Sequence, residues 1–131
     1  MANIGAHGAK QMLDWVLGGA AATQPSSRLA ALSLGTPTSV SGSEVGSNSG
    51  YIRQTALFGA AASPAGSASN TAAMTFGPFS SSNAIQGLLI YDTISINSGN
   101  IWWYGTLLTA RTVLPGDTLF VAAGGLIITL G

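Results

Sequence analysis

Side chains that could carry acid–base or nucleophilic chemistry are few in this chain and stand apart from one another. The acids are Asp14, Glu44, Asp92 and Asp117, and each is isolated in the sequence. His7 is the only histidine, and a histidine that acts as a general base needs a nucleophile and an orienting partner. Two carboxylates could still meet in the folded chain, but a glycosidase would normally add a polar, aromatic cleft. We therefore predict that the protein is not an enzyme and has no catalytic residue.

The motifs of metal, cofactor and nucleic-acid sites are also missing from the sequence. It contains no cysteine, no D-x-D-x-D-G calcium loop and no phosphate-binding G-x-x-x-x-G-K-[ST] motif. Arg28, Arg53 and Arg111 are too few to follow a phosphate backbone, and the net charge is zero. We therefore expect no cofactor, no metal site, no nucleic acid, no membrane and no small-molecule substrate.

The low charge itself favours a protein that is covered by partners. Only 6% of the residues are charged, against roughly 25% in ordinary soluble domains. Such a surface gives a free monomer little protection against association. One interpretation is a small β domain with a polar, uncharged surface. The interpretation that we favour is a subunit whose surface is largely covered by neighbouring subunits.

Arg53 is the arginine whose surroundings suggest a function. It lies beside Tyr51 in a predicted strand over 51–58, and the alternation of a strand places both side chains on one face. Arginine and tyrosine are enriched among the residues that dominate protein–protein binding. Arg53 could instead be an ordinary sheet-surface arginine whose stem packs on apolar neighbours. We take Tyr51 and Arg53 as candidate interface residues.

Three consecutive aromatic residues, Trp102, Trp103 and Tyr104, must divide between the two faces of a strand over 101–110. The face of Trp103 includes Gly105, which leaves room for a bulky neighbour from the opposite sheet, so we assign Trp103 to the core. The face of Trp102 and Tyr104 mixes rings with hydroxyls, as is common at interfaces. We assign these two to a subunit contact, although the N-terminal helix could cover Trp102 instead. A one-residue bulge would exchange the two faces.

The elements that must position these residues begin with a short helix. Met12, Trp15 and Val16 recur at helical spacing, which predicts a helix over 9–17, and the Gly18-Gly19 pair ends it. About nine residues are too few for a helix that is stable alone in water. The helix must dock on its own sheet or on a neighbouring subunit, so Trp15 joins the candidate interface residues.

From residue 28 onward, short apolar or alternating runs separated by turn residues predict an antiparallel β domain. The predicted strands cover 28–34, 51–58, 70–76, 84–92, 101–110, 119–122 and 126–130, and a long polar loop covers 35–50. The apolar run 88–90 predicts that the strand over 84–92 is buried on both sides. The expected fold class is mainly β: an antiparallel β-sandwich, jelly-roll-like, with one short N-terminal helix. We expect residues 1–27 to form an N-terminal arm and the short helix, with 1–7 as an extended arm. Residues 28–131 form the β-sandwich, in a single domain overall.

Six segments carry a family likeness through their order and spacing. They are LDWVLGG at 13–19, GYIRQ at 50–54, NTAAMTF at 70–76, YGTLLTA at 104–110, PGDTL at 115–119 and AAGGLIITL at 122–130. Together they make the chain, over nearly its whole length, resemble a group of small virion structural proteins of tailed bacteriophages. Members of that group are labelled as tail-fibre or as head-associated cement proteins. The resemblance implies a virion component with a β-sandwich or jelly-roll fold.

Two roles on the particle are consistent with this resemblance. The first is a capsid cement or decoration protein that binds between major capsid subunits and stabilises the head. Its partners would be the major capsid protein and copies of itself, and its location the head surface of the virion. The alternative is a tail, fibre or baseplate component, which could contact a host glycan through aromatic residues such as Trp102 and Tyr104. Copy number separates the two roles, because a cement protein is abundant in the particle and a tail part is not.

Overall fold

The computed structural model describes residues 2–46, 49–63 and 66–130, and these residues form a mainly β structure with one helix. Its elements are β1 (Ala2–Ile4), α1 (Ala6–Leu17), β2 (Leu29–Ser33), β3 (Gln54–Thr55), β4 (Ser67–Ser69), β5 (Met74–Phe76), β6 (Asn83–Tyr91), β7 (Ile101–Val113), β8 (Leu119–Val121) and β9 (Ile127–Thr129). The predicted fold class is confirmed. Within the described residues, no helix combines the length and apolar character needed to cross a membrane.

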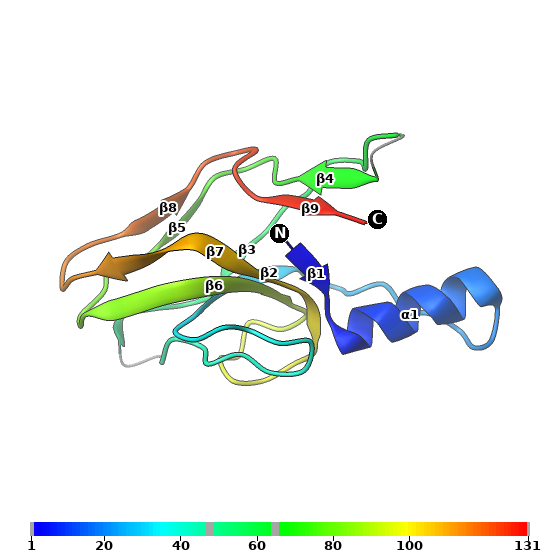
Figure 1. The fold of residues 1–131 in the computed structure, drawn as a ribbon, viewed down its shortest axis with the longest axis horizontal. Coiled ribbons are helices and arrows are strands. Elements are labelled where there is room, and N and C mark those ends of the chain that lie inside the picture. Colours follow the sequence, from blue (N-terminus) through cyan, green and yellow to red (C-terminus); the bar gives the residue numbers. More distant parts are fainter. Residues whose placement is uncertain (1, 47–48, 64–65, 131) are drawn as a thin grey trace.

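The first layer of the sandwich is a five-stranded antiparallel sheet in the order β1-β7-β6-β2-β3 (Figure 1). The central strand β6 contains the apolar run 88–90, which the sequence predicts to be buried on both sides. Leu89 and Ile90 are 0% and 3% exposed and belong to hydrophobic clusters on opposite faces of the sheet, which confirms that prediction. Successive side chains of β6 point to opposite faces of the sheet, and both faces are packed.

The second layer consists of two separate ribbons, β4-β9 and β5-β8, which lie over one face of the large sheet (Figure 1). The main core between the layers contains Ala30, Leu32, Val45, Tyr51, Ala56, Met74, Phe76, Phe79, Ile85, Ile90, Val113 and Ile128. A jelly roll would present a second continuous sheet. The described strands form no such sheet, so that detail of the prediction is not confirmed.

Loops cover the opposite face of the large sheet. A Cβ added at Gly87 would lie 2.6 Å from Pro37 Cδ, and one added at Gly42 would lie 2.8 Å from Leu89 Cδ2. The long loop predicted over 35–50 therefore packs directly on β6 over its described residues. It also forms an isolated bridge to β2, between Glu44 and Ser33.

The N-terminal residues form a paired edge strand, which corrects the expectation of an extended arm over 1–7. β1 pairs antiparallel with β7, and Ile4 lies opposite Trp103. A Cβ added at Gly8 would lie 2.7 Å from the Trp102 carbonyl oxygen, and Gly5 meets the Ile101 carbonyl even more closely. These glycines let the first turn of α1 pack against the backbone of β7, so the helix begins at Ala6, earlier than its apolar spacing predicts.

The end of α1 lies where the sequence places it. Gly18 adopts a left-handed conformation (φ 69°, ψ 19°), and its N–H donates to the Asp14 carbonyl oxygen at 2.9 Å. Glycine adopts this conformation at little steric cost, which explains why the helix stops there.

Two predicted strands lose more than half of their length in the structure. The strand predicted over 51–58 is reduced to β3, because Tyr51 and Arg53 turn inward to a buried polar cluster. The strand predicted over 70–76 keeps only β5, because the Asn70 side chain replaces strand pairing with bonds of its own. Its amide nitrogen donates to the Ala72 and Ala122 carbonyl oxygens at 2.8 and 2.9 Å.

Candidate protein interface

Tyr51 and Arg53 lie inside the domain, which corrects their assignment to an interface. They are 0% and 2% exposed. The Arg53 guanidinium makes a bidentate pair with the Glu44 carboxylate, with Nε and Nη2 each 2.7 Å from one carboxylate oxygen. The Tyr51 hydroxyl donates to Glu44 Oε1 at 2.9 Å, and burial together with the Glu44 charge raises the pKa of Tyr51. Neither side chain reaches a partner while the domain stays folded.

The same cluster holds the loop between β6 and β7 against the sheet. Arg53 Nη1 donates to the carbonyl oxygens of Thr93 at 2.6 Å and Ser98 at 3.0 Å. The Asn97 N–H donates to Glu44 Oε2 at 3.0 Å. The guanidinium carbon of Arg53 also lies 3.7 Å from the centre of the Tyr91 ring. The sequence analysis did not predict Glu44 as the partner of Arg53. The pairing could have been suspected, because the chain has few charges and Glu44 is a lone acid close in sequence to Tyr51 and Arg53.

A bulge in β7 decides how the three consecutive aromatic residues are placed. The pairing of β6 with β7 passes from Ile90–Trp103 to Tyr91–Ile101, so Trp102 is an extra residue on β7. Trp103 packs against the main core, on the face to which the sequence assigns it, but it is only partly buried. Tyr104 packs against the smaller cluster on the other face. Ile101 belongs to that cluster too, although strict alternation would place it with Trp103.

Trp102 lies against the first turn of α1, which is the helix-covered alternative for this residue. Its ring and the His7 ring meet edge to face, with centroids 5.1 Å apart. Its indole Nε1 is 3.4 Å from Asp92 Oδ2. Burial raises the pKa of Asp92, but donation from the Asn100 N–H, the Asn100 side chain and the Trp102 indole outweighs it. The pKa of Asp92 therefore lies below its ordinary value.

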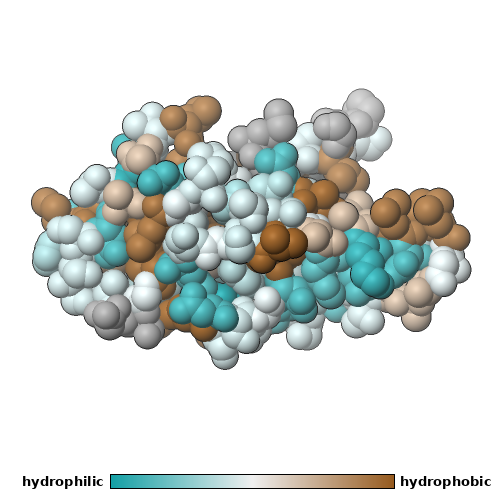
Figure 2. Space-filling view, turned by 60° about the horizontal axis from the view of Figure 1, so that its bottom comes forward, coloured by the Kyte–Doolittle hydropathy of each residue, from teal (hydrophilic) through white to brown (hydrophobic). Residues whose placement is uncertain are grey.

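The C-terminal half of α1 projects from the body of the protein (Figure 1), and its apolar side chains are exposed. We call Leu13, Trp15, Val16 and Leu17 the α1 tip; their exposed fractions are 58%, 77%, 65% and 75%. Figure 2 shows hydrophobic side chains gathered at this end of the molecule beside a hydrophilic stretch. Trp15 is thus placed where a partner could reach it.

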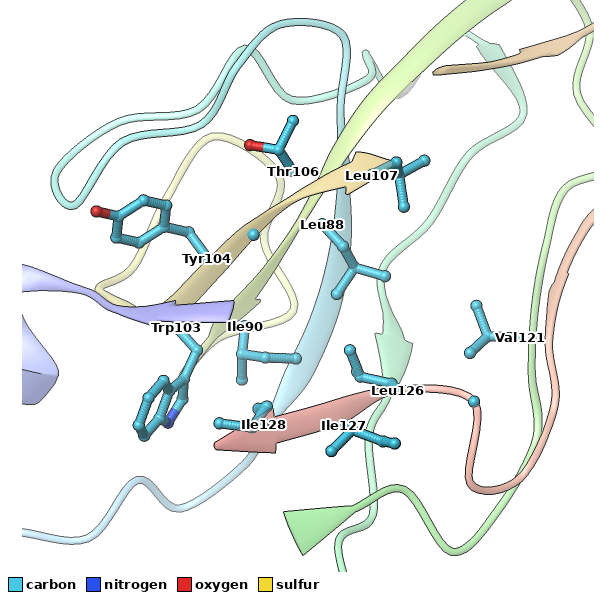
Figure 3. A pocket seen from close by; sticks show the side chains of 12 residues that line it. Leu88, Ile90, Trp103, Tyr104, Thr106, Leu107, Val121, Leu126, Ile127 and Ile128 are labelled. Carbon is cyan, nitrogen blue, oxygen red and sulfur yellow. The ribbon is translucent and has the colours of Figure 1, made fainter. Parts of the chain in front are cut away.

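A second apolar surface lies where the two layers of the sandwich fail to close. We call it the edge cleft: it has a volume of about 310 Å³ and lies between β6–β7 and the segment that runs from β8 to β9. Leu88, Trp103, Gly105 and Leu107 line one wall, and Val121, Leu126, Ile127 and Ile128 line the other. Figure 3 shows the leucine and isoleucine side chains of the two walls facing one another across the hollow.

β1 pairs with part of the outer edge of β7, next to the edge cleft. β1 pairs with residues 103–105, and no described strand continues along this edge. Past Thr106 the strand bulges: the pairing with β6 jumps from Gly87–Thr106 to Ile85–Arg111. Leu108 lies on this bulge and is fully exposed. The predicted room beside Gly105 is therefore real, but no neighbour from the opposite layer fills it.

Asn70 holds the wall of the cleft that the segment between β8 and β9 forms. It is a second residue whose role the sequence did not reveal. Besides its two donated bonds, Asn70 Oδ1 accepts from the Leu126 N–H at 2.8 Å, and its backbone carbonyl accepts from the Gly124 N–H at 2.7 Å. Asn70 is 2% exposed. The wall is thus fixed by buried hydrogen bonds before any partner arrives.

The acidic side chains all serve local structure. Asp14 pairs with Lys10 at 2.6 Å, Glu44 with Arg53, Asp92 bonds Asn100, and Asp117 accepts from the Leu114 N–H at 2.9 Å. Among the described residues, no three His, Cys, Asp or Glu side chains come close enough to hold a metal ion. What the structure offers to other molecules is apolar surface.

Comparison with known families gives this surface a context. Residues 3–129 match a protein-family model described as "Podophage GP4 fiber I protein gp80". The chain belongs to this family. A search of curated proteins gives no match. Membership of the gp80 family makes the protein a structural component of a bacteriophage virion, as the resemblance implies. The family description names a fibre, which agrees better with the alternative, a tail or fibre component, than with a capsid cement protein.

Proposed function

We propose that this protein is a non-enzymatic structural subunit of a phage fibre. The observation that carries the proposal is the family match, which extends over residues 3–129 and is described as a fibre protein. The proposal replaces the role that the sequence favours, a cement protein between major capsid subunits on the head surface. It keeps the expectation that copies of the chain are among its partners.

The surface of the protein supports a role in assembly. Monomeric soluble proteins seldom expose large contiguous apolar patches, and such patches mark contact sites. Here the α1 tip is exposed on the helix, and Leu108, Phe120 and Ile127 are exposed around the edge cleft. A structural subunit covers surfaces of this kind in the particle.

The glycan-contact role that the sequence allows for a fibre is not part of the proposal. It needs exposed aromatic rings beside polar groups, and it was assigned to Trp102 and Tyr104. Both rings are partly buried, and Trp102 lies against α1. The described residues give no other reason to place a sugar on them.

Copy number in purified virions tests the proposal. The amount of the protein is measured by gel densitometry or quantitative mass spectrometry, with the major capsid protein and the tail proteins of the same particles as internal standards. We expect a copy number close to that of the tail proteins, and immunolabelling at the tail end of the particle. An amount close to that of the major capsid protein, with label over the head, would overturn the fibre role and restore the cement role.

Heat stability of the particle gives a second test. A cement protein binds only the assembled shell and stabilises it, by about 2.7 kcal/mol per site at 100 times the dissociation constant. A fibre subunit does not bind between the capsid subunits, so it adds nothing to the stability of the shell. Particles that lack the protein should therefore release their genome at the same temperature as complete particles.

A further inference from the structure

The protein carries two apolar surfaces that its own chain leaves without a partner. The α1 tip projects away from the body, and the edge cleft opens beside β7 beyond the end of β1 (Figure 1). The first turn of α1 is fixed to β7 through Gly5 and Gly8. Because the helix is held at that end and points outward, its tip does not reach the cleft of the same chain.

We propose that the α1 tip of one copy docks in the edge cleft of a second copy. This deepens the proposed function, since it names the partner and the surfaces by which a structural subunit assembles, and it rests on that structural role. The contact uses two different surfaces, so it is heterologous. When it repeats, a heterologous contact builds a ring where its rotation closes and an open filament where it does not.

The shape of the two surfaces supports this pairing. Leu13, Val16 and Leu17 stand at i, i+3 and i+4, so they form one stripe on the helix. An amphipathic helix that lays such a stripe into a hydrophobic groove is a recurrent mode of protein recognition. Gly105 is one of the residues that line the cleft, and it contributes no side chain to the wall. The bulky side chains of the stripe would occupy the space beside this glycine.

The charges of the two surfaces favour a second copy over a charged partner. On the helix, Lys10 and Asp14 neutralise each other at 2.6 Å. On the other side, the cleft continues into an open groove between the β7 bulge and β8, whose charged residues are Arg111 and Asp117, one of each sign. A strongly charged partner would find no complementary field on either surface. A neutral apolar helix, which this chain itself presents, loses nothing by entering.

The stability of the helix gives an independent reason for the contact. The 12 residues of α1 are at the lower limit for a helix in water. Its first turn contacts β7 through His7 and Gly8, and Leu13, Val16 and Leu17 in its second half are exposed. Docking in a neighbouring cleft would bury that half.

Cross-linking between single-cysteine variants tests the contact directly, because the natural chain has no cysteine. Gly19→Cys marks the end of α1, where an added Cβ meets nothing closer than 4.0 Å. Thr106→Cys marks the cleft, and Ser95→Cys, on the exposed loop between β6 and β7, is the matched control. The variants are mixed in pairs and treated with a short bis-maleimide reagent, and the products are separated on a gel.

We expect a cross-linked dimer from Gly19→Cys with Thr106→Cys, and none above background from Gly19→Cys with Ser95→Cys. Equal yields from both mixtures, or no dimer from either, would overturn the proposal. A dimer that forms best from Gly19→Cys alone would overturn it too, since the helices would then pair with each other.

Sedimentation velocity on two matched variants provides the second test. Val16 is 65% exposed on the α1 tip, and Ile94 is 64% exposed on a distant loop. Val16→Asp should raise the dissociation constant for self-association by about ten-fold or more, as for a central interface residue. Ile94→Asp should leave it unchanged, and both variants should melt like the natural protein. Equal effects of the two variants, or a natural protein that stays monomeric at all concentrations, would count against the contact.

These measurements use the purified protein and do not depend on where it sits in the virion. If the contact forms but the protein is as abundant as the major capsid protein, the fibre role fails and the contact stands. If the protein is scarce and tail-located but does not cross-link through the cleft, the fibre role stands and the contact fails.

Discussion

The two faces of the large sheet differ in how completely the rest of the chain covers them. On one side, the 35–46 and 92–100 loops close over the sheet, and the ion pair of Arg53 with Glu44 lies in the interior with side chains 0% and 1% exposed. On the other side, the two ribbons leave the edge cleft open along β7, and leucine and isoleucine side chains stay accessible. One side of the sheet thus buries an ion pair beneath its loops, and the other side leaves an apolar cleft open.

This contrast indicates what each side is for. Burying an ion pair contributes little net stability, because the desolvation cost offsets the attraction, but removing one partner is costly. The closed side is therefore organised for one defined arrangement of its loops. Among the described residues, those that line the cleft and its adjoining groove include two charged side chains, Arg111 and Asp117, so few charges protect this surface against association. This surface is suited to contacts between subunits.

The largest effect is expected from breaking the ion pair on the closed side. Arg53→Met leaves the Glu44 carboxylate buried without its partner, and it should lower the free energy of unfolding by about 3–5 kcal/mol. Urea denaturation of the purified protein measures this. The double variant Glu44→Gln/Arg53→Met should recover part of the loss, because no charge remains uncompensated. A loss below about 1 kcal/mol for Arg53→Met would show that water reaches the cluster.

A comparison of two aromatic residues tests the difference between the buried main core, which lies between the two layers, and the wall of the cleft. Phe76 is 0% exposed in the main core, so Phe76→Ala should cost about 3–5 kcal/mol of stability. Trp103 is partly exposed at the cleft. Trp103→Ala should cost less, about 1–3 kcal/mol, because part of the ring already lies in water. Denaturant melts of the free protein decide the order, and a larger loss for Trp103→Ala would mean that the cleft is closed in solution.

A smaller effect is expected from pH at the junction of α1 and the β6–β7 loop. The pKa of Asp92 is lower in the folded protein than its ordinary value. A depressed pKa means that the carboxylate contributes stability above the unfolded pKa, near 3.9, and that this contribution is lost as pH falls through the folded pKa. The loss should stay under about 1 kcal/mol, because Asp92 is partly open to solvent. Melts between pH 5 and pH 2 measure this loss of stability, and Asp92→Asn is the variant that lacks the carboxylate. An identical pH profile for both proteins would show that Asp92 makes no contribution to the pH dependence of stability.

The smallest effect on the free protein is expected at the α1 tip. Trp15 is 77% exposed, so Trp15→Ala should change the free energy of unfolding by no more than about 0.5 kcal/mol, as for most exposed positions. A buried ring in the isolated chain would cost several times as much. The melting temperature of dilute protein measures the effect. A drop comparable to that of Phe76→Ala would place the ring in the core.

Some features of the protein follow from local sequence. The end of α1 needs only Gly18, because glycine accepts a left-handed conformation at any such position. The burial of 88–90 on both sides of β6 follows from a continuous apolar run, and the expectation of β structure follows from short runs and turn residues. These properties depend on residues within a few positions of one another, so spacing and residue type are enough to predict them.

The candidate interface depended on tertiary structure. Arg53 and Glu44 are brought together by a loop, and without that pairing Arg53 reads as a surface residue. The bulge at Trp102 changes which neighbours share a face, and a bulge leaves no mark in the order of residue types. The cleft lies between residues of β6 and β7 and residues 121–128, which belong to different layers of the sandwich. Each of these outcomes is set by contacts between segments far apart in the chain, so only the folded structure could decide which apolar surfaces stay open.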